Sequence, residues 1–291
     1  NNYLQKIIAI DSHTYGIHLY GSNNEIIDSS FLNSAYYDFY ISASWDDDCK
    51  NLLVNVNGTD NKPIVYYNYS VNIKNWNNNV SEIILCNADN SSIDNVLIDH
   101  ADKKNNGILL LRTDYTNITN SKILNTYRGI CLVYSNNNNL INITANSNYD
   151  GINIYGDNNY LTNITANSNH YGIRLSSATD NTIADSHVEG NSAYGIYLYH
   201  SGNNKIYNNL FNNTDNFYIS PTNLNYWNTT RQTGNRIYSP GTEIGGNYWT
   251  NSTGNGYSDT CADADTDGFC DDPYTLATDN VDYLPLSDEY V

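Results

Sequence analysis

An acidic loop near the C-terminus is the stretch of sequence with the clearest chemistry. Carboxylates stand at its first, third, fifth and ninth positions, a glycine at its sixth and a backbone carbonyl at its seventh: Asp263, Asp265, Asp267, Asp271, Gly268 and Phe269. This spacing of oxygen ligands is typical of Ca²⁺-binding loops. Tyr274 stands where such a loop usually carries a glutamate. The loop therefore predicts a structural Ca²⁺ site that orders the C-terminal segment, with a solvated acidic loop as the alternative.

The chain has five cysteines, an odd number. Cys261 and Cys270 flank the acidic loop, so we expect a disulfide between them in an oxidising compartment. Cys131 lies at an outward-facing strand position two coils after Cys86, about 10 Å away, which is too far for a disulfide. Cys49 has no obvious partner, and the roles of Cys49, Cys86 and Cys131 stay open.

Charged and aromatic side chains recur at outward-facing positions of the predicted strands. Arg128 and Asp150 should lie one coil apart and form an ion pair, with His170 and Arg174 nearby and Asp157 and Asp180 in the neighbouring turns. No pair of carboxylates can be assigned to glycoside hydrolysis. Basic residues are too few to favour a lyase acting on uronic acids. We therefore assign no catalytic residue, and interpret the outward tyrosines as a sugar-binding or protein-binding stripe or as stacking that stabilises the rod.

These side chains must be positioned by a repeat with a period near 22 residues. A Gly-Ile-x-Leu/Ile motif begins at five regularly spaced glycines: Gly107, Gly129, Gly151, Gly172 and Gly195. Alternation within the motif directs the first and third residues after each glycine inward. Two further apolar positions follow about eleven and sixteen residues after the glycine, as in Ile118 and Ile123. Three short strands per coil predict an all-β, right-handed parallel β-helix in which like side chains stack.

The turns between the predicted strands contain a second periodic feature. An Asn or Asp recurs about thirteen residues after each glycine, at Asn120, Asn142, Asn163, Asp185 and Asn208. Such residues tolerate left-handed backbone and bond to neighbouring backbone groups, so we expect a stacked turn ladder, with a generic polar loop as the alternative.

The repeat divides the chain into two parts. Residues 1–220 should form about ten coils, with irregular coils between Gly16 and Gly107, and residues 221–291 an aromatic cap in which Trp227 and Trp249 cover the last rung. The sequence starts in the middle of a coil, so the first rung has unpaired backbone groups. Loss of upstream residues is one explanation. The other is self-association of the chain, either head-to-tail into a filament or laterally.

Composition restricts the partners and the location. The net charge is −18, with only 13 basic residues, which argues against nucleic acid as a partner and fits divalent cations. We expect no membrane span, and the absence of methionine predicts a processed N-terminus, in line with a removed signal peptide. Ten N-x-S/T sequons support an extracellular location. Those most suited to glycosylation are Asn68, Asn90, Asn228 and Asn251.

The chain resembles the NosD-like parallel β-helix repeat proteins, in particular secreted archaeal cell-surface versions. The resemblance is carried by the repeated motif and its Asn-rich turns, by the segments 62–67 and 245–249, and by the ending from Asp263 to Leu286. It implies an extracellular β-helix with a small cap of Ca²⁺ type. Copper maturation, attributed to the founding members, is not implied, because the chain has no methionine and no His/Cys cluster.

We therefore expect a non-catalytic extracellular structural protein, such as a surface-layer, sheath or filament subunit or an adhesin. The alternative is a carbohydrate-active β-helix enzyme (a lyase, hydrolase or epimerase) or a sugar-binding adhesin. A possible partner in either case is a surface polysaccharide.

Overall fold

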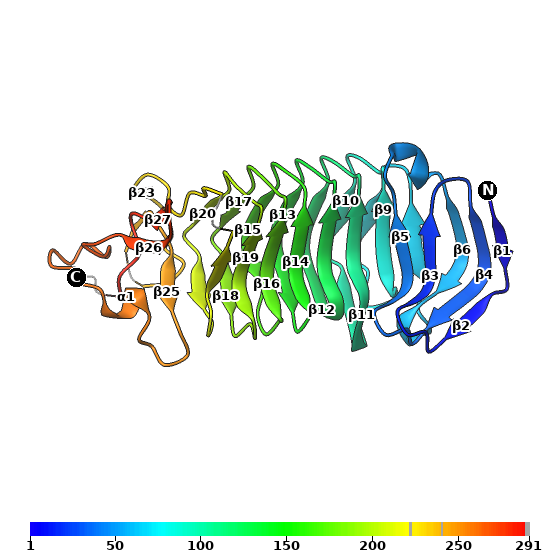
Figure 1. The fold of residues 1–291 in the computed structure, drawn as a ribbon, viewed down its shortest axis with the longest axis horizontal. Helices are drawn as coiled ribbons and strands as arrows, with labels where there is room; N and C mark the ends of the chain where they lie inside the picture. The colour runs from blue at the N-terminus through cyan, green and yellow to red at the C-terminus, as the bar shows by residue number, and fades with distance from the viewer. Residues whose placement is uncertain (221–222, 240, 289–291) are drawn as a thin grey trace.

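The computed structural model describes residues 1–220, 223–239 and 241–288. Strands stack along one axis into a rod (Figure 1), and the described chain contains three short helical segments: η1 (Asp46–Cys49), η2 (Thr59–Asn61) and α1 (Tyr257–Thr260). The predicted all-β parallel β-helix of about ten coils is confirmed. Among the described residues, no helix is long and apolar enough to cross a membrane.

The main solenoid begins after residue 62 and is built from parallel strands. Its strands are β7 (Ile64–Tyr67), β8 (Asn72–Lys74), β9 (Glu82–Cys86), β10 (Ser92–Asp94), β11 (Leu97–Leu111), β12 (Asn117–Val133), β13 (Asn139–Asn146), β14 (Asp150–Tyr155), β15 (Tyr160–Thr165), β16 (Tyr171–Ser176), β17 (Thr182–Ala184), β18 (His187–Glu189), β19 (Tyr194–Tyr199), β20 (Lys205–Tyr207), β21 (Leu210–Asn212), β22 (Phe217–Ile219) and β25 (Tyr248–Thr250). Strands that carry the Gly-Ile-x-Leu motif pair with one another from coil to coil. We call the stack of β7, β9, β11, β12, β14, β16, β19 and β22 the glycine sheet.

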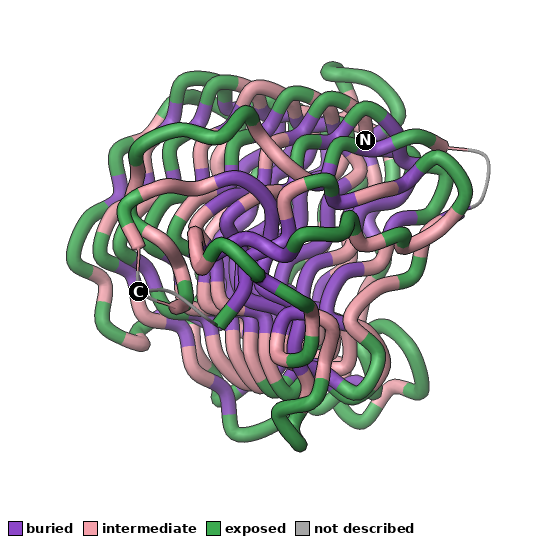
Figure 2. Tube along the Cα trace, turned by 90° about the vertical axis from the view of Figure 1, so that its left-hand side faces the viewer, coloured by how far each residue is buried: buried purple, intermediate pink, exposed green. Residues whose placement is uncertain are grey.

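The core is a set of stacked columns of like side chains. Ile108, Ile130, Ile152, Ile173 and Ile196 are aligned by the strand register, and each is fully buried. β-branched side chains suit this arrangement because they pack well on a pleated surface. Seen down the axis, buried residues fill the centre of the rod (Figure 2). The two later apolar positions of each coil are buried in the same core cluster, which confirms the three-strand coil.

Stacked Asx residues form ladders at the turns. The predicted ladder is present, since Asn120, Asn142, Asn163, Asp185 and Asn208 all have positive φ. Successive side chains in it are bonded, for example Asn142 Nδ2 to Asn120 Oδ1 at 2.7 Å. Two further ladders are fully buried and were not predicted. One runs through Asn138, Asn159, Asn181, Asn204 and Asn225, and the other through Asn148, Asn169, Asn191 and Asn213.

The N-terminal strands form a separate stack, which differs from the expectation of one continuous series of coils. They are β1 (Tyr3–Gln5), β2 (Ile8–Ile10), β3 (Tyr15–Tyr20), β4 (Glu25–Leu32), β5 (Tyr37–Ser42) and β6 (Leu52–Asn57). β5 pairs with β3 and not with β7. The segment of residues 36–50, called the arm below, packs instead on the outer surface of the glycine sheet.

The arm and the glycine sheet share a second hydrophobic core. Phe39, Ile41 and Cys49 of the arm cluster with Ile84, Leu109 and other residues whose side chains point out of the main solenoid. The physical reason is that this part of the sheet is apolar on both faces, and an apolar outer face is stabilised by being covered. In these coils, a side chain that points out of the main solenoid is therefore not necessarily exposed to solvent.

The cap closes the C-terminal end. It contains β23 (Gln232–Thr233), β24 (Glu243–Ile244), β26 (Tyr274–Ala277) and β27 (Asn280–Asp282), in two antiparallel pairs. Trp249 stacks on Phe211 of the preceding coil at 4.7 Å, and Trp227 is fully buried beside it. The Trp227 indole N–H donates to Asn280 Oδ1 at 3.0 Å, so β27 holds the tryptophan over the core.

Candidate functional site

The outer surface of the glycine sheet carries a row of polar and charged side chains. The residue before each motif glycine points outward, and the register aligns Asn106, Arg128, Asp150 and Tyr171 in one column. A second column contains Cys131, Asn153, Arg174 and Tyr197. Because adjacent strands lie about 4.8 Å apart, the side chains of both columns are close enough to interact.

Two arginines share one buried carboxylate in this row. Arg128 Nε lies 3.3 Å from Asp150 Oδ2, and Arg174 Nη1 lies 4.0 Å from the same oxygen. The predicted ion pair between neighbouring coils is therefore present. Asp150 is 1% exposed, and burial raises the pKa of its carboxyl although both guanidinium groups and Asn153 act to lower it.

Most unpartnered buried polar atoms of the described chain lie on or against this surface. Nine such side-chain atoms occur in all, and seven belong to this region: Tyr37 OH, Glu82 Oε2, Asn106 Oδ1, Asp150 Oδ1, Asn153 Oδ1, Arg174 Nε and Ser176 Oγ. Buried polar groups normally have a hydrogen-bond partner, which can be a bound water or a ligand. Their concentration on one surface marks it as a candidate binding region.

A groove runs along the same surface. One part has a volume of about 550 Å³ and is lined by Tyr40, Arg128, Tyr134, Tyr155, Asp157, Ser176 and their neighbours. A second part of about 230 Å³ lies between the arm and the sheet, and it shares Tyr40, Arg128, Val133 and Tyr134 with the first. The arm supplies one wall through Tyr40, and the sheet supplies the opposite wall. A groove with several tyrosines and a few polar groups suits a sugar ligand.

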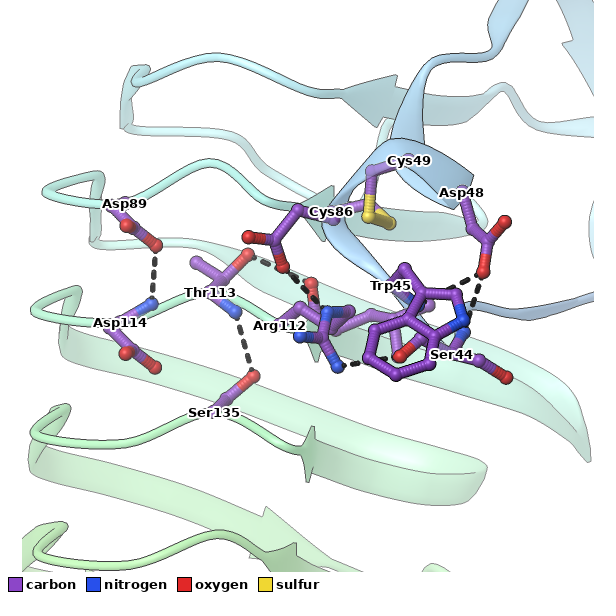
Figure 3. Close-up of polar contacts among 12 residues, drawn as sticks. Ser44, Trp45, Asp48, Cys49, Cys86, Asp89, Arg112, Thr113, Asp114 and Ser135 are labelled. Carbon is purple, nitrogen blue, oxygen red and sulfur yellow. Dashed lines mark hydrogen bonds and ion pairs between the residues drawn. A yellow bond between two sulfur atoms is a disulfide. The ribbon is translucent and has the colours of Figure 1, made fainter. Parts of the chain in front are cut away.

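A disulfide, an ion pair and a hydrogen bond attach the arm to the sheet (Figure 3). Cys49 forms a disulfide with Cys86 of β9. Arg112 Nε lies 2.7 Å from Asp46 Oδ1, and Arg112 Nη1 donates to the carbonyl of Ser44 at 3.1 Å. Sequence reasoning gave Cys49 no partner, because the partner depends on the arm folding back across β9.

The arm also changes the setting of the fifth cysteine. Cys131 was assigned an outward position, yet it is fully buried and is the free cysteine of the described chain. Its Sγ lies 3.9 Å from Arg128 Nη1. Burial raises the pKa of the thiol despite the nearby arginine, so this cysteine is held in its neutral form.

The remaining polar candidates lie at the edge of the groove or away from it. His170 packs between the rings of Tyr149 and Tyr171, at 4.6 and 4.5 Å, and does not line the groove. Asp157 lines it, and its carboxylate accepts the backbone N–H of Thr179 at 2.7 Å. Asp180 lines a different surface depression.

Several of the outward tyrosines stack from coil to coil. Tyr127 and Tyr149 are parallel at 4.9 Å, and Tyr197 and Tyr218 at 4.6 Å. Tyr171 and Tyr197 also face the Arg174 guanidinium at 5.4 and 5.3 Å. The aromatic stripe thus stabilises the rod and fixes the orientation of the charged side chains.

The acidic loop of the cap brings three carboxylates together. Ligand oxygens of Asp263, Asp265 and Asp267 lie within 4.8 Å of one another. Asp263 accepts the backbone N–H groups of Asp267 and Gly268 at 3.1 and 2.9 Å, which closes the loop. Asp267 is also paired with Arg231. An all-oxygen donor set of this kind fits a hard cation such as Ca²⁺.

The other predicted loop residues flank this cluster. Cys261 and Cys270 are joined by a disulfide. Asp271 Oδ2 accepts the backbone N–H of Ala264 at 3.1 Å, while Phe269 pairs with Leu286 through a β-bridge. Asp271 therefore braces the start of the loop and lies outside the cluster of three carboxylates.

The four favoured sequons differ in exposure. Asn68 and Asn90 are exposed, whereas Asn228 and Asn251 are half-buried. The Asn251 amide donates to Asn255 Oδ1 at 2.8 Å, and that of Asn228 donates to the Thr229 carbonyl at 3.0 Å. Asn68 and Asn90 are the more accessible of the four.

Comparison with known structures finds other proteins of related shape at low identity. The A-module of a mannuronan C-5 epimerase from Azotobacter vinelandii is 12% identical, with 86% of this chain and 77% of that chain covered and a TM-score of 0.49. The enzymatically active domain of bacteriophage CBA120 tailspike protein 2 is 13% identical, with 77% and 43% covered and a TM-score of 0.46. A periplasmic alginate epimerase is 12% identical, with 73% and 64% covered and a TM-score of 0.46. No curated protein matches the chain in sequence.

The family model that matches the chain is described as periplasmic copper-binding protein (NosD), and it covers residues 54–254, more than half of the sequence. The donor groups of this chain do not fit copper. The cluster of three or more ligand side chains found among the described residues is the all-carboxylate set of the cap, whereas copper favours imidazole and sulfur ligands. Both ring nitrogens of the buried His100 are bonded to backbone carbonyls. With its main solenoid inside the matched range, the chain belongs to the NosD family of parallel β-helix proteins.

Proposed function

We propose that this protein is a non-catalytic extracellular structural protein whose groove binds a polysaccharide. The observation that carries the proposal is the tyrosine-lined groove between the arm and the glycine sheet, where two lining residues, Asn106 and Ser176, have an unpartnered buried polar atom. Tyrosine rings offer flat apolar surface and a hydroxyl at small entropic cost, which suits sugar rings.

A binding role fits the groove better than glycoside hydrolysis. Hydrolysis requires two carboxyl groups on either side of the scissile bond. Asp150 is buried and paired with arginines, Asp157 is held by a backbone N–H, and Glu82 is fully buried beneath Asn106. None of the three is arranged as a free acid or base facing the groove.

Binding and turnover can be separated in one set of experiments. Titration calorimetry with neutral and acidic polysaccharides should show binding, while assays for reducing ends and for unsaturated products should stay at background. Tyr155→Ala should weaken binding about three- to tenfold, since one aromatic stacking contact contributes about 0.5–1.5 kcal/mol. Tyr160→Ala is the matched control, because Tyr160 is an exposed tyrosine on β15, away from the groove. Release of product would replace this proposal with the carbohydrate-active enzyme.

The location and the cap belong to the same proposal. Two disulfides support an oxidising compartment outside the cytoplasm. Ca²⁺ held by Asp263, Asp265 and Asp267 would neutralise the crowded carboxylates of the cap. Glycans would be carried by the exposed Asn68 and Asn90 before Asn228 and Asn251.

Self-association is the remaining part of the structural role. Apolar side chains on the outer surface of the N-terminal strands support it: Ile8 is 71% exposed, Ile10 52% and Leu52 48%. Electron microscopy of the purified chain tests this part. Fibres or paired rods are expected, and uniformly single rods at all concentrations would remove it.

A further inference from the structure

We propose that Arg128 makes the groove selective for an anionic sugar unit, whose carboxylate or sulfate accepts hydrogen bonds from the guanidinium. This inference rests on the proposed polysaccharide binding and specifies the substrate class. It places the anionic group where the two parts of the groove meet, because Arg128 lines both of them.

The guanidinium of Arg128 has N–H donors that are not engaged in hydrogen bonds within the protein. An arginine carries five N–H donors in a planar fork. Within the described chain, Nε is bonded to Asp150 at 3.3 Å, and Nη1 has only the weak contact with Cys131 Sγ at 3.9 Å. The remaining N–H groups are therefore available to a ligand. A carboxylate or sulfate matches this fork better than a sugar hydroxyl does, because two of its oxygens can accept in parallel.

The charge balance around Arg128 favours an anion. Arg128 and Arg174 both face one oxygen of Asp150, so these three side chains carry one net positive charge. Asp157 also lines the groove and carries a negative charge, but its carboxylate accepts the Thr179 backbone N–H and forms no ion pair with Arg128 among the described residues. Arg128 is one of only five arginines in a chain with a net charge of −18, and it is the cationic side chain that an anion entering the groove would meet.

The surroundings hold Arg128 in place before any ligand arrives. Its guanidinium lies 6.0 Å from the centre of the Tyr37 ring and 5.8 Å from that of Tyr127. A side chain fixed between aromatic rings and an ion-pair partner loses little entropy on binding. Ser176, a residue only 5% exposed, lines the same groove, and its buried Oγ has no hydrogen-bond partner.

The test compares polymers that differ in charge. Calorimetry at low salt would use polygalacturonate for the carboxylate, dextran sulfate for the sulfate, and dextran as the neutral polymer. At least one anionic polymer should bind about tenfold or more tightly than dextran, because a hydrogen bond to a charged group is worth more than a neutral one. Its affinity should fall as salt is added.

Two substitutions are expected to change the affinity for the anionic polymer in opposite directions, which misfolding of the variants would not do. Arg128→Gln should weaken binding of the anionic polymer about tenfold and change dextran binding much less. Asp150→Asn should strengthen it several-fold, because the paired arginines then carry two net charges. Lys122→Gln is the control, since it removes one positive charge from an exposed position outside the groove. Circular dichroism and the unfolding midpoint establish that each variant is folded.

The outcomes separate this inference from the function on which it rests. Equal affinity for dextran and both anionic polymers would overturn anion selectivity and leave polysaccharide binding intact. Weaker anion binding by folded Asp150→Asn would also overturn it. If none of the polymers binds, both proposals fail.

Discussion

Buried asparagines hold successive coils of this protein together. One such ladder runs through Asn159, Asn181 and Asn204. The side-chain amide of each asparagine donates to the side-chain oxygen of the asparagine in the next coil and to a backbone carbonyl in the preceding coil. The same oxygen also accepts the backbone N–H of the asparagine before it. Asparagine suits this place because it offers both a donor and an acceptor on a short side chain.

Removing one ladder residue should be destabilising. Asn181→Ala leaves the backbone N–H of Asn159 and the Gly156 carbonyl without partners in a fully buried site. We expect a loss of about 2–4 kcal/mol in the free energy of unfolding, since each unsatisfied buried group costs about 1–3 kcal/mol. Chemical denaturation measures it. Asn139→Ala, which removes one exposed side-chain bond to Asn117, should change the value by less than about 1 kcal/mol. Equal losses in the two variants would contradict the structural role of the buried ladder.

Asp282 should make stability depend on pH. It is fully buried in the cap, where it accepts the Trp249 indole N–H at 2.9 Å and the Asn247 backbone N–H at 2.8 Å. Burial raises its pKa to about 7, although these donors act to lower it. In the unfolded chain the pKa returns to about 3.9. The folded chain therefore binds more protons between these two values, and the free energy of unfolding should decrease as pH rises from 5 to 7 and then level off.

Denaturation curves from pH 5 to 8 measure this slope. Asp282→Asn should flatten it. It should also lower stability at pH 5, because both carboxyl oxygens accept N–H groups and the amide N–H₂ would have to face one of these donors. Asp150 and Glu82 also have raised pKa values from burial, so a smaller slope of the same sign should remain. Stability that increases from pH 5 to 7 would be evidence against this assignment.

The sequence predicted the inward side chains better than the outward ones. Alternation after each glycine correctly identified the buried columns, such as Ile130 and Ile152, because the pleat alone determines which side chains share a face. It could not predict that Cys131 and Asn153 would be buried as well. The burial of these outward side chains depends on which segment covers the outer face of the sheet, and the sequences of the neighbouring strands do not specify that segment. The Arg128–Asp150 pair was predicted because it depends only on register.

At the scale of elements, the arm is the feature that creates the groove. β5 belongs to the N-terminal stack, yet residues 36–50 contact β9, β11 and β12 through the second core. The contact joins residues far apart in the sequence, for example the carbonyl of Tyr36 with the backbone N–H of Asn105 at 2.9 Å. Local periodicity carries no information about such a pairing, so the sequence predicted irregular coils in this region but not which strands lie beside β5.

The Cys49–Cys86 disulfide should keep the arm closed. It joins residues 37 apart in sequence, and loss of a loop constraint of this size should lower the free energy of unfolding by about 2–4 kcal/mol. The double variant Cys49→Ala/Cys86→Ala should also let the arm open more often. A thiol reagent would then label Cys131 faster, because the arm covers that residue.

The labelling experiment has a control, and one result would contradict the prediction. In the wild-type protein the buried Cys131 should react slowly, and Cys131→Ala should abolish labelling without opening the arm. An unchanged labelling rate in the folded double variant would mean that the noncovalent contacts, such as Arg112 with Asp46, hold the arm by themselves.

At the scale of the whole molecule, the ends of the solenoid need more than the repeat provides. Each inner coil is stabilised by its two neighbours, whereas an end coil has one neighbour and an open core. At the C-terminal end, Trp249 and Trp227 cover that core, and β27 holds Trp227 through Asn280. The acidic loop connects α1 with β26 and leads into these strands. Order in the loop should therefore support the closure of the last rung.

Removal of Ca²⁺ should open the rod from this end. Without a cation, the repulsion among Asp263, Asp265 and Asp267 would oppose closure of the loop, although Arg231 offsets part of it. We expect EDTA to lower the midpoint of thermal unfolding by several degrees, and excess Ca²⁺ to restore it, because a ligand that binds only the folded state stabilises it. The variant Asp265→Asn should melt lower than wild type in Ca²⁺ and respond less to EDTA. Asp102→Asn, an exposed carboxylate far from the cap in sequence, should keep the wild-type response. A melting temperature unaffected by EDTA would leave the loop as a solvated acidic turn, with the cap held by its tryptophans and the Cys261–Cys270 disulfide alone.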